Sequence, residues 1–157
     1  MSVGFAVIPS AYVLLRRNGP RGREVLLQYR DGTGFLDHHW AFGAAGHVEA
    51  GETVFDAAVR EAAEELGVRI TPAALVPLTV VHRRHEDDSP VNQRVDFFFA
   101  CDSWLGEPEI RERHKSSQLT WARLDRLPTP MVPHEGAVLN ALAVGELAHV
   151  RTHGFDA

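Results

Sequence analysis

Three glutamates share one face of a predicted helix and could bind a metal ion. Glu61, Glu64 and Glu65 follow the i, i+3 and i+4 spacing that places Cβ atoms ~5–6 Å apart on a helix. In a medium of effective dielectric ~20, two carboxylates at that distance repel by roughly 3 kcal/mol. On an open helix surface the side chains splay into water, and the repulsion falls to roughly a few tenths of a kcal/mol. The cluster is therefore a solvated acidic face if exposed, and a candidate site for a divalent cation if it lines a cleft.

The helix that would position these glutamates is marked by signals at both ends. Thr53 is a typical N-cap residue, and Asp56, three residues later, completes a capping box. Gly67 stands where a helix commonly ends in the left-handed conformation. Because no glycine or proline interrupts the segment between these signals, the sequence predicts a helix over Val54–Leu66. The face opposite the glutamates has the spacing of a buried stripe, formed by Phe55, Val59, Ala62 and Leu66.

The helix belongs to a longer motif that runs from Gly46 to Val68 and reads GHVEAGETVFDAAVREAAEELGV. Gly46 is followed by five residues and Glu52, and then by seven residues and the run REAAEELGV. This pattern resembles the Nudix box, G-x5-E-x7-R-E-U-x-E-E-x-G-U with U aliphatic, at every fixed position. On these residues the chain is identified as a member of the Nudix hydrolase family, and it is similar to the MutT branch.

The resemblance implies an enzyme that uses Mg²⁺ or Mn²⁺ to hydrolyse a nucleoside diphosphate linked to another moiety. Such cations take oxygen ligands, commonly one or two carboxylates together with substrate phosphates. Glu61 and Glu65 are the first candidates for metal ligands, because the i, i+4 spacing places them most nearly in line. Glu64 is a further ligand or the general base. In the family, the backbone carbonyl of the first glycine of the box, Gly46 here, can also bind metal.

Two further residues of the box, Glu52 and Arg60, have a supporting part in the family. There the two side chains pair with each other, and the arginine holds the glutamates in position. A simpler alternative is a helix-surface contact between Arg60 and Glu64 at i, i+4. Either arrangement orients a carboxylate.

One more carboxylate is often supplied from outside the box. The charged loop over residues 105–117 contains Gly-Glu-Pro and resembles a MutT segment in which a metal-site glutamate follows at a fixed distance. That position falls on Glu112, which we expect to be both a metal ligand and a catalytic residue. The earlier loop offers three competing acids, Glu86, Asp87 and Asp88. For each of these side chains, a solvated loop acid is the alternative.

Missing family signatures reduce the range of candidate substrates. Relatives that cleave ADP-ribose often carry a proline downstream of the box, at a place that is Arg84 here. The signatures of dinucleoside-polyphosphate, coenzyme A and NADH hydrolases are missing. These gaps and the MutT-like loop favour a nucleoside triphosphate or a similar small nucleotide. An ADP-ribose or nucleotide-sugar pyrophosphatase and a non-catalytic ligand sensor remain the alternatives.

Several aromatic and basic side chains could contact such a nucleotide. The candidates for base stacking, each of which could equally be a core residue, are Phe35, Trp40 and Trp121. The candidates for binding phosphates, each of which could equally be solvated, are Arg30, Arg83 and Arg84.

Length and composition fit one domain over residues 1–157. The net charge of −5 gives no electrostatic footprint for duplex nucleic acid. No apolar stretch is long enough for a transmembrane helix, so no membrane contact is expected. Cys101 is the single cysteine, which excludes an intramolecular disulfide and favours the cytoplasm. The sequence leaves a homodimer open.

The order of the expected elements indicates an α+β domain. The expected strands cover residues 4–9, 11–17, 24–30, 40–42, 74–84, 91–103 and 118–124. A second helix is expected over residues 134–147. The family resemblance implies the Nudix fold, in which a mixed β-sheet is sandwiched between α-helices in three layers.

Overall fold

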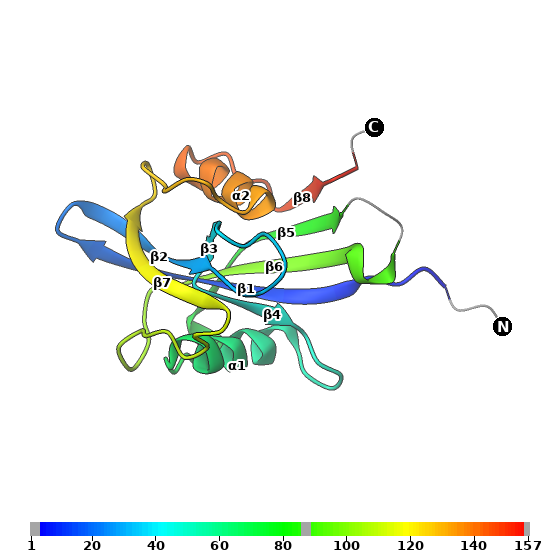
Figure 1. The fold of residues 1–157 in the computed structure, drawn as a ribbon, viewed down its shortest axis with the longest axis horizontal. Coiled ribbons are helices and arrows are strands. Elements are labelled where there is room, and N and C mark those ends of the chain that lie inside the picture. Colours follow the sequence, from blue (N-terminus) through cyan, green and yellow to red (C-terminus); the bar gives the residue numbers. More distant parts are fainter. Residues whose placement is uncertain (1–3, 86–88, 156–157) are drawn as a thin grey trace.

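A mixed β-sheet lies between two helices in the computed structural model, which describes residues 4–85 and 89–155 (Figure 1). Helix α1 (Val54–Leu66) covers one face of the sheet, and helix α2 (Pro133–Ala143) covers the other. The strands are β1 (Ile8–Gly19), β2 (Gly22–Arg30), β3 (Trp40–Phe42), β4 (Ala44–His47), β5 (Leu75–Arg84), β6 (Gln93–Cys101), β7 (Ser116–Arg123) and β8 (Val150–His153). Short 3₁₀ turns cover Pro72–Ala74 and Pro90–Asn92. The predicted α+β fold is confirmed.

Strand β1 is the centre of this arrangement. It pairs in parallel with β6 and antiparallel with both β2 and β4. The sheet runs in the order β3-β2-β1-β6-β5-β8, with β4 added to β1 and β7 added to β2. Because β4 holds the first glycine of the box, its pairing with β1 fixes the start of the motif against the sheet.

The structure corrects several element boundaries. The two expected strands over 4–9 and 11–17 are replaced by one strand, β1, which begins only at Ile8 and runs on to Gly19. Residues 43–45, expected to be a lead into the box, belong largely to β4, and β8 was not predicted. Both missed strands are only four residues long, and β4 is built from small residues of weak strand propensity, so tertiary pairing decides their structure. Helix α2 ends at Ala143 rather than at residue 147, shortly before Gly145 adopts a positive φ of 73°.

Helix α1 has the predicted ends but a shifted buried face. The Thr53 hydroxyl accepts a hydrogen bond from Asp56 N, the Asp56 carboxylate accepts one from Thr53 N, and Gly67 is left-handed with φ 69°. The fully buried residues of α1 are Ala57, Ala58, Ala62 and Leu66. Phe55, expected in the stripe, is 40% exposed and lies at the edge, against Phe99. Three alanines let the helix pack close to the sheet, which leaves a large ring at position 55 outside.

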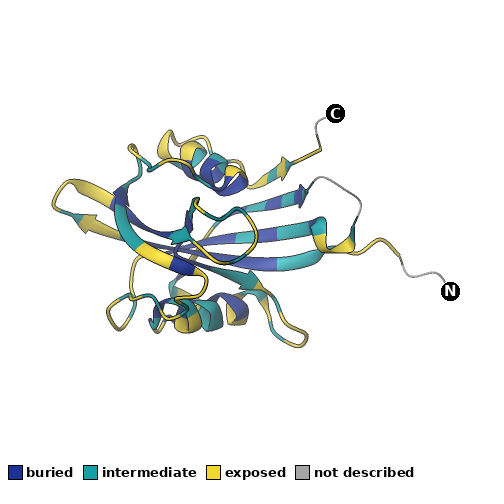
Figure 2. Cartoon of the chain, in the orientation of Figure 1, coloured by how far each residue is buried: buried dark blue, intermediate teal, exposed yellow. Residues whose placement is uncertain are grey.

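The core has two parts, one on each face of the sheet (Figure 2). The part under α1 includes Val13, Leu15 and Phe99, and the part under α2 includes Tyr12, Phe42 and Phe98. The side chain of Cys101 is fully buried in the part of the core under α1. Within residues 4–85 and 89–155, no helix has the length and apolar character needed to cross a membrane.

Candidate active site

Glu65 faces the sheet from the last turn of α1. Its Oε2 accepts a hydrogen bond of 2.6 Å from the backbone N–H of Ala45 on β4. Burial raises the pKa of Glu65 to about 8, against the lowering effect of that hydrogen bond, and the nearby carboxylates of Glu61 and Glu112 raise it further. At this place the ionised carboxylate of Glu65 would be stabilised by a positively charged neighbour.

Glu61 lies one turn earlier, against Gly46. A Cβ atom on residue 46 would stand only 2.0 Å from Glu61 Oε1, so only glycine leaves room for this carboxylate. The Glu61 side chain is 12% exposed. Burial raises the pKa of Glu61, and the charges of Glu64 and Glu112 act in the same direction, whereas Arg60 opposes them.

Glu64 occupies a different environment, at the rim of the helix. Its side chain is 50% exposed, and its Oε2 lies 3.3 Å from Arg60 Nη1. The predicted acidic face is therefore divided between two environments. Glu61 and Glu65 are turned toward β4, and Glu64 is accessible to water.

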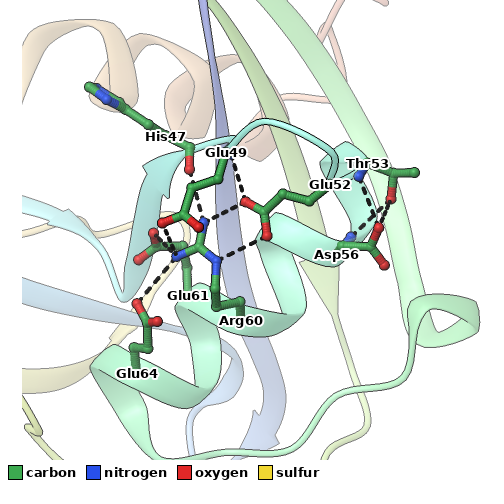
Figure 3. A network of polar contacts seen from close by, with 8 residues as sticks. All are labelled: His47, Glu49, Glu52, Thr53, Asp56, Arg60, Glu61 and Glu64. Atoms are coloured by element: carbon green, nitrogen blue, oxygen red, sulfur yellow. Dashed lines mark hydrogen bonds and ion pairs between the residues drawn. The ribbon is translucent and has the colours of Figure 1, made fainter.

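Arg60 connects the carboxylates of the box (Figure 3). Its Nε and Nη2 donate to the two oxygens of Glu52 at 3.0 and 2.6 Å, while Nη1 donates to Glu61 Oε1 at 2.8 Å. Nη2 also donates to the backbone carbonyl of His47 at 3.0 Å. The two hydrogen bonds from Arg60, followed by one from the backbone N–H of Glu49, lower the pKa of Glu52 to about 2. Arg60 thus makes both contacts that the sequence suggested, with Glu52 and with Glu64, and it also fixes Glu61.

Glu112 reaches the same place from the loop between β6 and β7. The loop is attached to the end of α1, because Glu109 N donates to Leu66 O and Arg111 N donates to Glu65 O, both at 3.1 Å. Lys115 Nζ lies 3.3 Å from Glu112 Oε2. This oxygen is nevertheless buried without a hydrogen-bond partner of suitable geometry in the described parts of the chain.

A second acid of the same loop, Glu109, differs from Glu112. The side chain of Glu109 is 63% exposed and pairs with Arg111 at 2.9 Å. The competing acids Glu86, Asp87 and Asp88 lie outside the described residues. Within the described parts of the chain, Glu112 is therefore the loop carboxylate whose charge acts on both Glu61 and Glu65.

A cavity of about 380 Å³ opens beside this cluster, between the sheet and α2. Gly46 and Glu65 belong to its wall, so the cavity is continuous with the carboxylates of α1. Of the side chains expected to contact a nucleotide, Phe35, Arg30 and Arg83 line it.

Three of the expected contact residues are not among the described residues that line the cavity. Trp121 stacks on Trp104 and carries the Arg17 guanidinium 4.1 Å from its ring centroid. Trp40 packs against Tyr29 and the core under α2. The third, Arg84, ends β5.

Two buried polar residues of the cavity, Glu135 and His134, were not predicted from the sequence. Glu135, near the start of α2, is almost fully buried, and its Oε1 accepts a hydrogen bond from Phe42 N at 2.8 Å. Burial raises the pKa of Glu135 to about 7. His134 lies 3.2 Å from the Tyr12 hydroxyl, and burial lowers its pKa well below the usual range. A His-Glu pair at the start of an apolar helix was the available signal.

The carboxylates fit a hard divalent cation by their chemistry. All the donors are oxygens, Glu112 Oε2 is buried without a hydrogen-bond partner in the described chain, and Gly46 leaves space beside Glu61. Within the described residues, no three His, Cys, Asp or Glu side chains already converge as a ligand set. Glu61 is directed to Arg60 and Glu65 to Ala45, so binding requires modest side-chain rotation.

Comparisons with known proteins agree with this fold. The family model of the NUDIX domain matches residues 7–142. An uncharacterized Nudix hydrolase of Bacillus subtilis is 28% identical over 109 residues, which cover 68% of this chain and 66% of that protein, slightly under two thirds of its length. The crystal structure of a MutT Nudix hydrolase from Burkholderia pseudomallei has a TM-score of 0.73 and 26% identity, over 86% of this chain and 97% of that one.

A third comparison shows the fold alone. A Nudix domain from Shewanella oneidensis, solved as a complex with ADP-ribose, has a TM-score of 0.68 and 15% identity, over 89% of this chain and 88% of that one.

The family model covers most of the chain, and the chain therefore belongs to the Nudix hydrolase family. Nudix hydrolases generally use divalent metal cations, and neighbours of this chain act on or bind nucleotides.

Proposed function

We propose that this protein hydrolyses a nucleoside diphosphate linked to another moiety in a reaction that depends on Mg²⁺ or Mn²⁺. A nucleoside triphosphate or a similar small nucleotide is the proposed substrate. The main support for this proposal is that the carboxylates of Glu61, Glu65 and Glu112 lie near one another beside a cavity. Gly46 and Glu65 are part of the wall of that cavity.

The cation would be held by Glu61, Glu65 and Glu112, with the Gly46 carbonyl and Glu64 as further oxygen donors. When bound, the cation would neutralise charge on the diphosphate and lower the pKa of a water molecule bound to it. The raised pKa values of Glu61 and Glu65 are consistent with this assignment, because they reflect carboxylates that are buried and that lie near other negative charges.

Two other side chains of the box, Arg60 and Glu64, have separate roles in the proposed reaction. Arg60, fixed by two hydrogen bonds to Glu52, sets the position of Glu61. Glu64 is half exposed and held by a single long contact of 3.3 Å, so it can turn toward water and accept a proton as the general base.

The cavity is the proposed nucleoside site. Its volume of about 380 Å³ lies in the range of small-ligand pockets, and its wall combines the rings of Tyr12, Phe35 and Phe42 with the polar ends of Gln28 and Glu135. A base could stack on the rings while the polar groups select its edge.

Two alternatives are kept. An ADP-ribose or nucleotide-sugar pyrophosphatase is favoured by the ADP-ribose complex of the Shewanella oneidensis domain. A non-catalytic ligand sensor would use the same cavity. The intact set of box glutamates weighs against the sensor, because such proteins usually lose some of them.

A substrate panel separates these functions. Nucleoside triphosphates, ADP-ribose and nucleotide sugars are incubated with the protein and Mg²⁺. The nucleoside mono- and diphosphates formed, together with released phosphate, pyrophosphate and sugar phosphate, are separated and quantified by chromatography. The proposal expects the highest kcat/KM for a nucleoside triphosphate and no turnover in EDTA. Hydrolysis of ADP-ribose alone would favour the first alternative, and binding without turnover of any compound would favour the sensor.

A further inference from the structure

Two arginines face each other at one end of the cavity. Arg83 on β5 and Arg94 on β6 are direct partners in the antiparallel register, and both line the cavity. Like charges directly opposite each other on two strands destabilise the sheet. Negative charge near Arg83 and Arg94 would offset this repulsion.

The one buried carboxylate of Asp96 is bound to Arg83, and only its charge acts on Arg94. Asp96 is fully buried and accepts a hydrogen bond of 2.7 Å from Arg83 Nε. No carboxylate of the described residues forms an ion pair with Arg94, whose Nε donates to the backbone carbonyl of Val91 at 2.6 Å. Burial and the neighbouring charge of Arg83 lower the pKa of the Arg94 guanidinium. Within residues 4–85 and 89–155, Arg94 is thus a half-buried cation without a carboxylate ion-pair partner.

The orientation of Arg94 is fixed by His47. A guanidinium can only donate hydrogen bonds, so His47 Nε2 accepts the bond from Arg94 Nη1. Arg94 Nη2 has no hydrogen-bond partner among residues 4–85 and 89–155, and the side chain lines the cavity. The other buried acid of the cavity, Glu135, is bound to Phe42 on β3, and β2 and β1 separate β3 from β6.

A second donor lines the same cavity as this cation. Ser10 on β1 is paired with His47 on β4 and with Asp96 on β6. Its hydroxyl is buried, lines the cavity and has no hydrogen-bond partner in the described chain. An anion at this place would accept hydrogen bonds from a guanidinium and a hydroxyl, which is a strong charge-assisted arrangement.

We propose that Arg94 and Ser10, with His47 positioning Arg94, form an anion subsite that binds a phosphate group of the substrate. This inference rests on the proposed function. Ser10, His47 and Arg94 line the same cavity as Gly46 and Glu65, so the subsite and the proposed metal site open onto one cavity. A substrate with a third consecutive phosphate places an anion there, whereas ADP-ribose places a neutral ribose beyond its diphosphate. The subsite therefore selects nucleoside triphosphates.

The test measures equilibrium binding of tripolyphosphate by calorimetry, in EDTA and at low salt, so that it does not depend on turnover. Arg94→Gln should weaken binding about tenfold or more, and Ser10→Ala should weaken it about threefold or more, because hydrogen bonds to charged groups are among the stronger ones. Arg126→Gln removes the same charge from an exposed arginine outside the cavity and should bind like the wild type. Thermal unfolding checks that each variant is folded.

The outcomes separate this inference from the function on which it rests. Equal affinities of the wild type and folded Arg94→Gln, or no binding by the wild type, would overturn the subsite. If the substrate panel shows no hydrolysis and Arg94→Gln still loses tripolyphosphate binding, the proposed function is refuted and the subsite is supported. With an active enzyme, Arg94→Gln should raise KM for the triphosphate and leave KM for ADP-ribose nearly unchanged.

Discussion

Replacing Gly46 with alanine should separate activity from stability. The new Cβ would stand 2.0 Å from Glu61 Oε1 and 2.2 Å from its Cδ. Ordinary contact begins at 3.4 Å, so the carboxylate must move by at least about 1.4 Å. A misplacement of about 1 Å in a catalytic site can lower turnover ~10²-fold, and we expect a loss of that size for Gly46→Ala.

Stability should change little in the same variant. The atoms that clash belong to the end of a flexible side chain, which can rotate away, and Gly46 has no positive φ that alanine would strain. Substituting alanine for such a glycine changes the free energy of unfolding by ~1 kcal/mol or less. The measurements are kcat with saturating nucleotide and Mg²⁺, together with the midpoint of thermal unfolding.

A neighbouring glycine provides the matched control. A Cβ on Gly43 would lie 3.2 Å from Leu66 Cδ1 and 3.3 Å from the backbone oxygen of Leu26, so the strain falls on the core rather than on a carboxylate. Gly43→Ala should therefore lose more stability and much less turnover than Gly46→Ala. Wild-type turnover in folded Gly46→Ala would refute the reasoning, because it would show that the position of Glu61 does not matter.

Three further substitutions test other parts of the site. Glu52 has a folded-state pKa lowered from 4.5 to about 2, so its pairing with Arg60 stabilises the protein above pH 4.5 and is lost as the pH falls toward 2; urea unfolding of Glu52→Gln should show less acid sensitivity in this window. Glu64→Gln should lower kcat ~10²-fold and leave the thermal midpoint unchanged, because the side chain is half exposed. Glu112→Gln should lower kcat about tenfold or more and raise the Mg²⁺ concentration needed for half-maximal activity, whereas Glu109→Gln should behave like the wild type.

Each of these expectations has a contrary result. Equal acid sensitivity of wild type and Glu52→Gln would show that the ion pair with Arg60 does not contribute to stability. A folded Glu64→Gln variant with wild-type turnover would remove Glu64 from the chemistry. Normal activity of Glu112→Gln, combined with a large loss in Asp87→Asn, would place the extra carboxylate in the earlier loop.

Local chemistry explains which elements could be predicted from the sequence. The ends of α1 depend on neighbouring residues, because Thr53, Asp56 and Gly67 cap the helix to which they belong. Strand β4 depends on β1, more than thirty residues earlier, and its own small residues carry little strand preference. The position of Phe55 depends on how closely α1 approaches the sheet, which periodicity alone does not determine.

The site divides in the same way. The candidate metal ligands of α1 follow from a fixed spacing within one helix, and Glu112 follows from a loop motif. The wall of the cavity does not, because Ser10, His47 and Arg94 meet only through the register of three strands that are far apart in the sequence. Glu135 contacts β3 from a helix that is ninety-three residues away along the chain. No local pattern encodes these contacts.

The carboxylates of α1 and Glu112 are proposed to hold a divalent cation. Soaking crystals in Mn²⁺ tests this assignment without relying on activity. Anomalous density should lie within about 2.3 Å of the carboxylate oxygens of Glu61 and Glu65, slightly beyond the Mg²⁺ distance. The same peak should be lost in crystals of Glu65→Gln. Anomalous density found only at histidine nitrogens, with none beside Glu61 and Glu65, would contradict the account.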